Sequence, residues 1–217
     1  MASKAESMKV VLDCGIIPVV RAESAEQAME IAEALKAGGL PVIEITMTVP
    51  GAFEVMREVS RRFGKEVVLG AGTVLDGETA RMAILAGAEF IVAPNLDRGT
   101  IEVCSRYSKI SVPGALTPTE AVTAWQWGAD LVKIFPVDTV GGPKYISALR
   151  APLPHILYVP TGGVDLANTA AFIKAGAAAL GVGASLVDKK AVAEKKYEVI
   201  TDLAKRFIEE IKKARSS

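Results

Sequence analysis

The sequence predicts an α/β fold, a single parallel eight-stranded (β/α)8 or TIM barrel, from its length, its composition and its alternating pattern. The 217 residues are fewer than the roughly 250 that are usual for such a barrel, but enough to bury one large core. Half of the residues are apolar and only 6% are aromatic, so the core must consist of the small branched side chains that parallel sheets favour. Short apolar runs alternate with amphipathic segments, as in successive β-α units.

Eight apolar runs are candidate strands, because each is too short for a helix and is followed by helix-like sequence. They are residues 16–21, 42–46, 67–73, 90–94, 111–114, 131–135, 158–161 and 179–182. No linker or low-complexity tract separates them. We therefore expect residues 1–217 to form one domain.

Capping signals mark the helices between these runs. Residues 24–27 and 117–120 have the spacing of capping boxes, and Pro118 would then occupy the favoured first helical position. Glycines that follow four amphipathic segments predict left-handed helix ends. These are Gly38, Gly87, Gly128 and Gly176.

Two further helices are expected outside the repeating units. Residues 3–14 predict a short N-terminal helix that ends before Gly15 and covers the lower end of the barrel. An amphipathic C-terminal helix is predicted from apolar residues at helical spacing, which are Val199, Ile200, Leu203, Phe207, Ile208 and Ile211. Packing on the barrel is the favoured use of this stripe, and binding of a partner is the alternative.

Composition argues against several classes of partner. Lys+Arg and Asp+Glu balance at 25 each, so we expect neither a nucleic-acid nor a membrane partner, and a cytoplasmic location. Cys14 and Cys104 are isolated and are interpreted as reduced structural thiols. The single histidine, His155, falls in a loop before the seventh strand, away from the expected site, so we expect no metal.

A lysine stands in the middle of the sixth strand candidate. Period-2 alternation puts Lys133 on the same face as Leu131 and Phe135. If this face is the barrel interior, the ammonium is desolvated and its pKa falls, which suits an amine that attacks a carbonyl. Glu44 occupies a similar place in the second strand candidate, beside Thr46, and would act as a general acid/base. A structural ion pair is the alternative for these two residues.

Binding groups are expected at the same ends of the strands. Arg21 closes the first strand candidate and would bind a carboxylate through two parallel hydrogen bonds, although a strand-end arginine is commonly a surface residue. Glycine clusters at residues 161–164 and 181–185 occupy the loops in which barrels often bind phosphate, with the Ser185 hydroxyl as an extra donor. Glycines also make tight turns, which is the alternative for each cluster alone.

Motifs at the strand ends resemble those of the 2-keto-3-deoxy-6-phosphogluconate (KDPG) and 4-hydroxy-2-oxoglutarate aldolases. The motifs are Glu44 in I-E-I-T, Thr73 in G-A-G-T-V, Pro94 in I-V-A-P, Lys133 in V-K-I-F-P, residues 113–120 as P-G-A-L-T-P-T-E and residues 160–164 as P-T-G-G-V. They occur in family order between about residues 16 and 186. The resemblance is therefore more specific than any one motif.

The resemblance implies that Lys133 forms a Schiff base with the 2-keto group while Glu44 moves protons through water. Arg21 and Thr73 would bind the pyruvate carboxylate, and Pro94 and Phe135 would line the site. The other substrate-binding residues would be Thr161, Gly162, Gly163, Gly183 and Ser185, the last four at the distal phosphate. The implied reaction is reversible cleavage to pyruvate and an aldehyde, as in Entner–Doudoroff carbohydrate metabolism, by a homotrimer that needs no cofactor.

Two questions stay open from the sequence. Some family members carry an arginine just past the second strand, where this chain has Thr48, and Asn95 also departs from the best-known members. The aldehyde is therefore either glyceraldehyde 3-phosphate or glyoxylate. The rival interpretations are a phosphate-binding barrel isomerase or epimerase, and a non-catalytic barrel used as a trimeric assembly scaffold. The isomerase would not need Lys133, and the joint presence of Lys133, Glu44, Thr73 and Arg21 argues against the scaffold.

Overall fold

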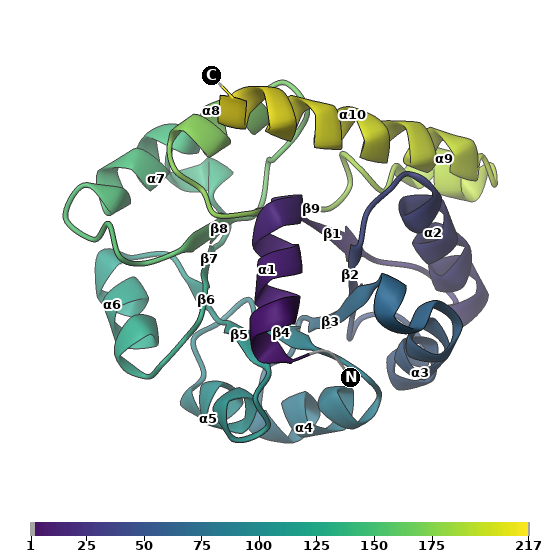
Figure 1. Ribbon diagram of the computed structural model, residues 1–217, viewed down its shortest axis with the longest axis horizontal. Coiled ribbons are helices and arrows are strands. Elements are labelled where there is room, and N and C mark those ends of the chain that lie inside the picture. Colours follow the sequence, from purple (N-terminus) through teal and green to yellow (C-terminus); the bar gives the residue numbers. More distant parts are fainter. Residues whose placement is uncertain (1–2, 217) are drawn as a thin grey trace.

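The computed structural model, which describes residues 3–216, has parallel strands at its centre and helices around them (Figure 1). The strands are β1 (Ile16–Val20), β2 (Val42–Thr46), β3 (Val68–Gly72), β4 (Phe90–Val92), β5 (Ile110–Val112), β6 (Gly114–Ala115), β7 (Val132–Ile134), β8 (Tyr158–Pro160) and β9 (Leu180–Val182). Strand structure occurs in each of the eight predicted runs, and most strands are slightly shorter than the run. The predicted α/β fold with a parallel sheet is confirmed.

The strands form two hydrogen-bonded groups within one curled arrangement. Six strands pair in the order β5-β4-β3-β2-β1-β9, and three pair as β6-β7-β8. The predicted strand at residues 111–114 is wrong as one continuous strand, because Pro113 separates β5 from β6. Proline has no N–H to donate to the ladder, and the next N–H, that of Gly114, donates to the carbonyl of Asn95 at 3.0 Å. A single bridge between Thr161 and Gly181 links the end of β8 to β9.

Helices surround the sheet on the outside, except for the first. They are α1 (Lys4–Cys14), α2 (Ala25–Ala37), α3 (Ala52–Phe63), α4 (Gly77–Leu85), α5 (Arg98–Arg106), α6 (Pro118–Gln126), α7 (Pro143–Arg150), α8 (Thr169–Lys174), α9 (Lys189–Ala193) and α10 (Tyr197–Ser216), with short 3-10 helices η1 (Gly64–Glu66) and η2 (Asp138–Val140). In Figure 1, α1 stands in front of the centre of the curled sheet. The prediction of an N-terminal helix over the lower end is confirmed.

Alternate residues of each strand face opposite sides, so two apolar cores form. The inner core lies within the curled sheet and is closed at the N-terminal ends of the strands by α1. Its buried residues are Val11, Ile17, Val42, Val68, Phe90, Val92, Ile110, Val112, Leu131, Val159 and Ala179. The outer core fills the space between the sheet and the surrounding helices. Gly70 makes room for the Phe90 ring in the inner core, because a Cβ at position 70 would lie 2.1 Å from that ring.

The C-terminal helix α10 packs against α2 and α8 through one apolar face. Ile200, Phe207 and Ile211 are buried on this face, which confirms packing on the rest of the chain as the use of the predicted stripe. Val199 was predicted to belong to the stripe but is 37% exposed. It lies in the first turn of the helix, where the buried face begins with Ile200.

Most of the predicted helix ends are confirmed. Gly87, Gly128 and Gly176 all have positive φ angles. Gly38 is the exception, with φ −75°. Its lack of a side chain has another cause: a Cβ at this position would lie 2.5 Å from the Cβ of Ala204 in α10. Glycine is needed here for close packing of two helices.

The two predicted capping boxes differ in outcome. Thr117 and Glu120 form the complete box at the start of α6, with Pro118 in the first turn. Ser24 accepts a hydrogen bond from the backbone N–H of Gln27 as expected, but the Gln27 side chain accepts from the N–H of Glu23 instead of that of Ser24. The capping box at residues 24–27 is therefore only half formed.

The remaining features concern hydropathy, the two cysteines and the single histidine. Within residues 3–216, no helix is both long enough and apolar enough to cross a membrane. Cys104 is buried and Cys14 is partly buried, and both are free thiols. His155 is exposed, with its ring 4.7 Å from that of Trp125 between centroids.

Candidate active site

Lys133 lies at the centre of β7 and points toward the inner face of the curled sheet. Its side chain is buried, with the residue only 6% exposed. Leu131, two residues earlier, belongs to the inner core, and the ring of Phe135, two residues later, has its centroid 4.9 Å from Nζ of Lys133. The predicted inward alternation of Lys133 with Leu131 and Phe135 is therefore confirmed.

Glu44 lies at the centre of β2 and is 2% exposed. Its carboxylate occupies the space above Gly72 of β3, because a Cβ at position 72 would lie 1.8 Å from Oε1 of Glu44. Oε1 is buried and has no hydrogen-bond partner within the described residues. A buried carboxylate oxygen without a partner is costly. It is therefore a group that a substrate or a water molecule would satisfy.

Burial changes the proton affinity of both groups. Desolvation lowers the pKa of Lys133, an effect that the negative charge of Glu44 opposes. Desolvation raises the pKa of Glu44 to about 7, although the charges of Lys133 and Arg21 act in the opposite direction. None of the ion pairs found among residues 3–216 joins Lys133 to Glu44. A direct structural ion pair, the alternative for these two residues, is therefore not formed.

Arg21 follows β1 at the C-terminal ends of the strands, which we call the mouth. Its side chain is exposed, yet its charge influences both Lys133 and Glu44. The end of β1 is held by Thr46, whose hydroxyl donates to the carbonyl of Val20 at 3.0 Å. A further hydrogen bond of 2.8 Å joins the hydroxyls of Thr46 and Thr48. These contacts position the backbone from which Arg21 projects.

Thr73 and Pro94 follow β3 and β4 at the mouth. Thr73 has a φ of 57°, a left-handed conformation that is uncommon for a residue other than glycine. Such strained residues concentrate at functional sites. Pro94 is partly buried, and Gly114 packs directly on its carbonyl, since a Cβ at position 114 would lie 2.3 Å from that oxygen.

The glycine loops after β8 and β9 contact each other. Gly162 and Gly163 have φ angles of 95° and 66°. The Ser185 hydroxyl donates to the carbonyl of Val164 at 2.5 Å, which joins the second loop to the first. Gly183 borders open space, where an added Cβ would meet nothing within 4 Å. The structure therefore brings the two predicted loops together beside Thr161, the last residue in register with β9.

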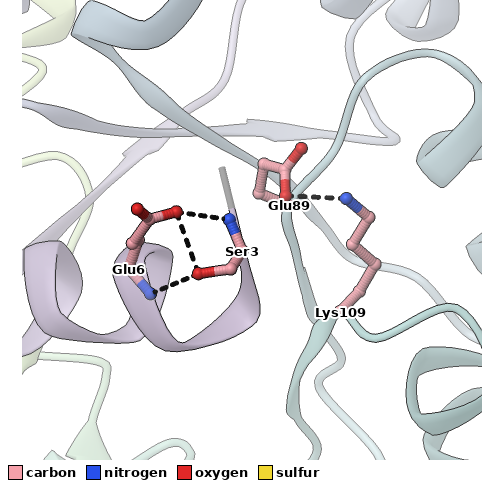
Figure 2. A network of polar contacts seen from close by, with 4 residues as sticks. All are labelled: Ser3, Glu6, Glu89 and Lys109. Carbon is pink, nitrogen blue, oxygen red and sulfur yellow. Dashed lines mark hydrogen bonds and ion pairs between the residues drawn. The ribbon is translucent and has the colours of Figure 1, made fainter. Parts of the chain in front are cut away.

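Sequence analysis did not single out two inner residues, of which Gly72 belongs to this site and Lys109 lies elsewhere. Gly72 makes room for the Glu44 carboxylate, and only its position two residues past Gly70 in β3 hinted at an inward-facing glycine. Lys109 is a second buried lysine, 7% exposed. Its Nζ lies 2.7 Å from Oε2 of Glu89. Figure 2 shows this pair near the capping box that Ser3 and Glu6 form at the start of α1. Lys109 precedes β5, so it belongs to the end opposite the mouth.

Metal ligands are not grouped in the part of the chain that is described. Among residues 3–216, no three His, Cys, Asp or Glu side chains gather in a way that would hold a metal ion.

A parallel α/β fold with an inward lysine of lowered pKa next to a buried carboxylate is typical of enzymes that act through a lysine imine. The chain belongs to the KDPG and KHG aldolase family, whose sequence model matches residues 8–203. It is 33% identical over 194 residues to a 2-dehydro-3-deoxy-phosphogluconate aldolase of Treponema pallidum, covering 89% of this chain and 92% of that one. It is 30% identical to the KHG/KDPG aldolase of Escherichia coli, covering 89% and 91%. The resemblance found in the sequence is thus confirmed.

Solved structures agree with this assignment. A structure described as native KDPGal matches with a TM-score of 0.86 and 31% identity, covering 93% of this chain and 96% of that one. A KDPG aldolase of Legionella pneumophila matches with a TM-score of 0.83 and 27% identity, covering 92% and 96%, and holds pyruvate as a covalent carbinolamine intermediate. A porous protein cage designed by fusing symmetric oligomeric domains matches with a TM-score of 0.85 and 30% identity, covering 93% of this chain and 73% of that one.

Proposed function

We propose that the protein is a class I aldolase that reversibly cleaves KDPG, and also 4-hydroxy-2-oxoglutarate, to pyruvate and an aldehyde. The observation that carries the proposal is the buried Lys133, whose pKa is lowered, beside the Glu44 carboxylate on the same inner face. Family membership supports it, as does the covalent pyruvate adduct held by the Legionella relative.

In the proposed reaction the neutral amine of Lys133 attacks the C2 carbonyl, and water leaves to give a protonated imine. The imine draws electrons from C3, so the C3–C4 bond breaks and leaves an enamine of pyruvate. Glu44, through water, removes the proton of the C4 hydroxyl as the aldehyde forms. The enamine is then protonated at C3, and water releases pyruvate. A pKa of about 7 lets Glu44 accept and return protons near neutral pH.

Substrate binding is assigned to the residues around the mouth. Arg21 and Thr73 bind the pyruvate carboxylate, while Pro94 and Phe135 line the site. The acceptor side includes Thr161, and Gly162, Gly163, Gly183 and Ser185 would bind the distal phosphate through backbone N–H groups and the Ser185 hydroxyl. The contact between the Ser185 hydroxyl and the Val164 carbonyl supports a shared role for the two loops.

The proposal includes a closed eight-stranded barrel that forms one domain over residues 1–217. Only Pro113 lies between β5 and β6, and this short separation together with the bridge between Thr161 and Gly181 supports closure of the sheet on itself. The enzyme would act in the cytoplasm, which suits its two free thiols.

A homotrimer is the proposed assembly. Ring-shaped assemblies need two different surfaces on each copy, and two exposed apolar groups lie on different parts of the molecule. Leu75, Met82 and Leu85 lie in or just before α4, whereas Trp125, Trp127 and Leu157 lie around α6 and before β8. Light scattering after size exclusion should give three times the chain mass, and Leu85→Lys should lower it. A monomeric parent would contradict the trimer without touching the aldolase proposal.

The activity is tested by pyruvate release from KDPG, its galactose epimer and 4-hydroxy-2-oxoglutarate, together with reductive trapping. Pyruvate plus borohydride should add the mass of reduced pyruvate to the protein, because borohydride reduces an imine to a stable amine. Prior treatment with a chelator should leave turnover unchanged. Absence of both cleavage and trapping would overturn the proposal and favour the scaffold, whereas turnover that needs an added metal would favour another barrel enzyme.

A further inference from the structure

A cavity of about 250 Å³ lies at the N-terminal ends of the strands, on the side of the sheet opposite the mouth. It is bounded by α1, by the end of α3 with η1, and by the segments that lead into β3 and β4. Small-molecule sites usually have volumes of about 300–1,000 Å³, so this cavity would admit a ligand of only a few carbon atoms. None of the residues that line it takes part in the chemistry proposed above.

Ser7 of α1 lines the cavity and has an unsatisfied side chain. The residue is fully buried, and its hydroxyl has no hydrogen-bond partner within the described residues. Burial of a hydroxyl without a hydrogen bond is costly. A hydroxyl can both donate and accept. A ligand group that also does both would therefore satisfy Ser7 in either orientation.

Two further polar groups line the same cavity, on the side of the sheet. The Ser60 hydroxyl packs against Gly87, since a Cβ at position 87 would lie 2.7 Å from its Oγ. Glu89 uses one carboxylate oxygen, Oε2, to bind Nζ of Lys109 at 2.7 Å (Figure 2). Among the described residues, Oε1 of Glu89 accepts no hydrogen bond from another side chain. This oxygen is therefore an acceptor for a hydroxyl of the ligand.

The charges around the cavity are balanced. Glu89 forms an ion pair with Lys109. Lys65, the other charged residue that lines the cavity, is exposed and lies near Glu6 of α1. Hydrogen bonds from Ser3 lower the pKa of Glu6, and the positive charge of Lys65 acts in the same direction. Because each charge has an opposite charge near it, the cavity favours a neutral ligand that forms hydrogen bonds over an ion.

The apolar wall of the cavity is fixed by the sheet. Val67, Val68 and Leu69 form this wall and are buried. The N–H of Val68 donates to the carbonyl of Pro41 at 2.7 Å, and the N–H of Glu89 donates to the carbonyl of Leu69 at the same distance. The backbone around the cavity is therefore held before any ligand binds, and the wall offers carbon atoms to the C–H groups of a ligand.

We propose that this cavity is a binding site for a short, neutral polyol of about four carbon atoms. Its hydroxyl groups donate to Oε1 of Glu89 and form hydrogen bonds with the hydroxyls of Ser7 and Ser60. Its C–H groups pack on the apolar wall. The proposal goes beyond the aldolase function and does not depend on it, because the cavity lies at the end of the strands opposite Lys133 and Glu44.

The test is a titration of the protein with erythritol, followed by backbone amide chemical shifts. The comparison compound is 1,4-butanediol, which has the same carbon chain without the two inner hydroxyls. Erythritol should give saturable shifts at Ser7, Leu69 and Glu89, with an affinity of about millimolar. Butanediol should bind at least about fivefold more weakly. Saturation is decisive, because excluded polyols also stabilise proteins without occupying a site.

Variants locate the binding. Ser7→Ala and Ser60→Ala should each weaken erythritol binding about fivefold, because each removes one hydrogen bond. Ser7→Ala should leave the unliganded protein at least as stable to urea, since the hydroxyl that it removes has no partner. Ser105→Ala is the matched control and should bind like the parent, because Ser105 is exposed and does not line the cavity.

Three results would overturn the polyol site. They are shifts confined to the mouth, shifts that grow linearly and equally with both compounds, and an unchanged affinity in Ser7→Ala. With the second result, the cavity holds water only. Pyruvate trapping is measured on the same protein, and its failure would overturn the aldolase proposal without affecting this one.

Discussion

Lys133 and Lys109 are both buried, and the charge of a glutamate acts on each, but only Lys109 forms an ion pair with its glutamate. Nζ of Lys109 lies 2.7 Å from Oε2 of Glu89, near the N-terminal ends of the strands (Figure 2). Lys133 has no such pair with Glu44, and Oε1 of Glu44 has no hydrogen-bond partner in the described structure. A closed pair satisfies both charges, whereas an open pair transfers the cost of burial to the pKa values. Burial alone therefore does not distinguish the two lysines, whereas a direct contact with a glutamate does.

The largest expected effect is on the chemistry of Lys133 and Glu44, the open pair, in which the two side chains form no direct ion pair. Lys133→Met should abolish pyruvate trapping and lower kcat for KDPG by at least about 10⁴-fold, because the nucleophile is removed. Lys109→Met is the matched control and should leave trapping intact in the folded protein. Mass mapping of the reduced adduct checks both. An adduct on Lys109, or one that persists in Lys133→Met, would contradict the comparison.

A smaller loss of rate is expected from the acid of the open pair. Glu44→Gln should lower kcat by roughly 10²- to 10⁴-fold, because proton transfer is lost while the amine can still attack. Imine should therefore still be trapped, although turnover is slow. Glu89→Gln should leave kcat of the folded protein unchanged. An equal loss of kcat in Glu44→Gln and Glu89→Gln would contradict a specific role of Glu44 in proton transfer.

The free energy of unfolding should rank the substitutions in the reverse order, with a larger loss at Lys109 than at Lys133. Lys109→Met leaves the partly buried Glu89 without its ammonium and should cost about 1–3 kcal/mol in the free energy of unfolding. A second substitution, Glu89→Leu, should recover much of this loss, since it removes the unpaired charge. Lys133→Met should cost much less, because it removes a desolvated charge that has no direct partner. Urea unfolding at neutral pH measures all three, and a larger loss for Lys133→Met would reverse our assignment of roles.

The pH dependence of stability sharpens the same comparison. The pKa of Glu44 is about 7 in the folded chain, against an ordinary value of 4.5. The folded chain binds the proton of Glu44 more tightly than the unfolded chain does, so protonation of Glu44 stabilises the fold. This stabilisation is fully present below pH 4.5 and is lost as the pH rises through 7. Glu44→Gln cannot lose it. The unfolding free energy of Glu44→Gln minus that of the parent should therefore grow by about 3 kcal/mol between pH 4.5 and pH 7.5. A flat or falling difference in urea titrations would refute the raised pKa.

The arrangement of the fold was largely predictable because its signals are local. Each short apolar run contained a strand, and the inward direction of Lys133 followed from alternation with Leu131 and Phe135. The same alternation predicted burial of Glu44 in β2. The expected loops after β8 and β9 also contact each other, through Ser185 and the Val164 carbonyl. Local periodicity is therefore sufficient to indicate which side chains share the inner face.

Features that depend on distant contacts were not predictable in this way. Gly38 was expected to end a helix in a left-handed conformation, but it is required by Ala204, which is far along the chain. Lys109 was overlooked because it precedes its strand, and its pairing with Glu89 depends on the neighbouring strand. Pro113 illustrates another limit of local patterns. The apolar run around it predicts one strand, although the proline interrupts the hydrogen-bonded ladder.

The contact between Glu44 and Gly72 has a consequence for how sequences of this kind diverge. A carboxylate at position 44 and a side chain at position 72 exclude each other, since even a methyl group would lie 1.8 Å from Oε1 of Glu44. Alanine at position 72 is a substitution of one methyl group that would ordinarily pass as neutral in an alignment. In a homologous gene it would nevertheless report that the carboxylate has moved. The residue type at position 72 can thus help genome surveys to separate homologues that hold a carboxylate in this place from homologues that share only the fold.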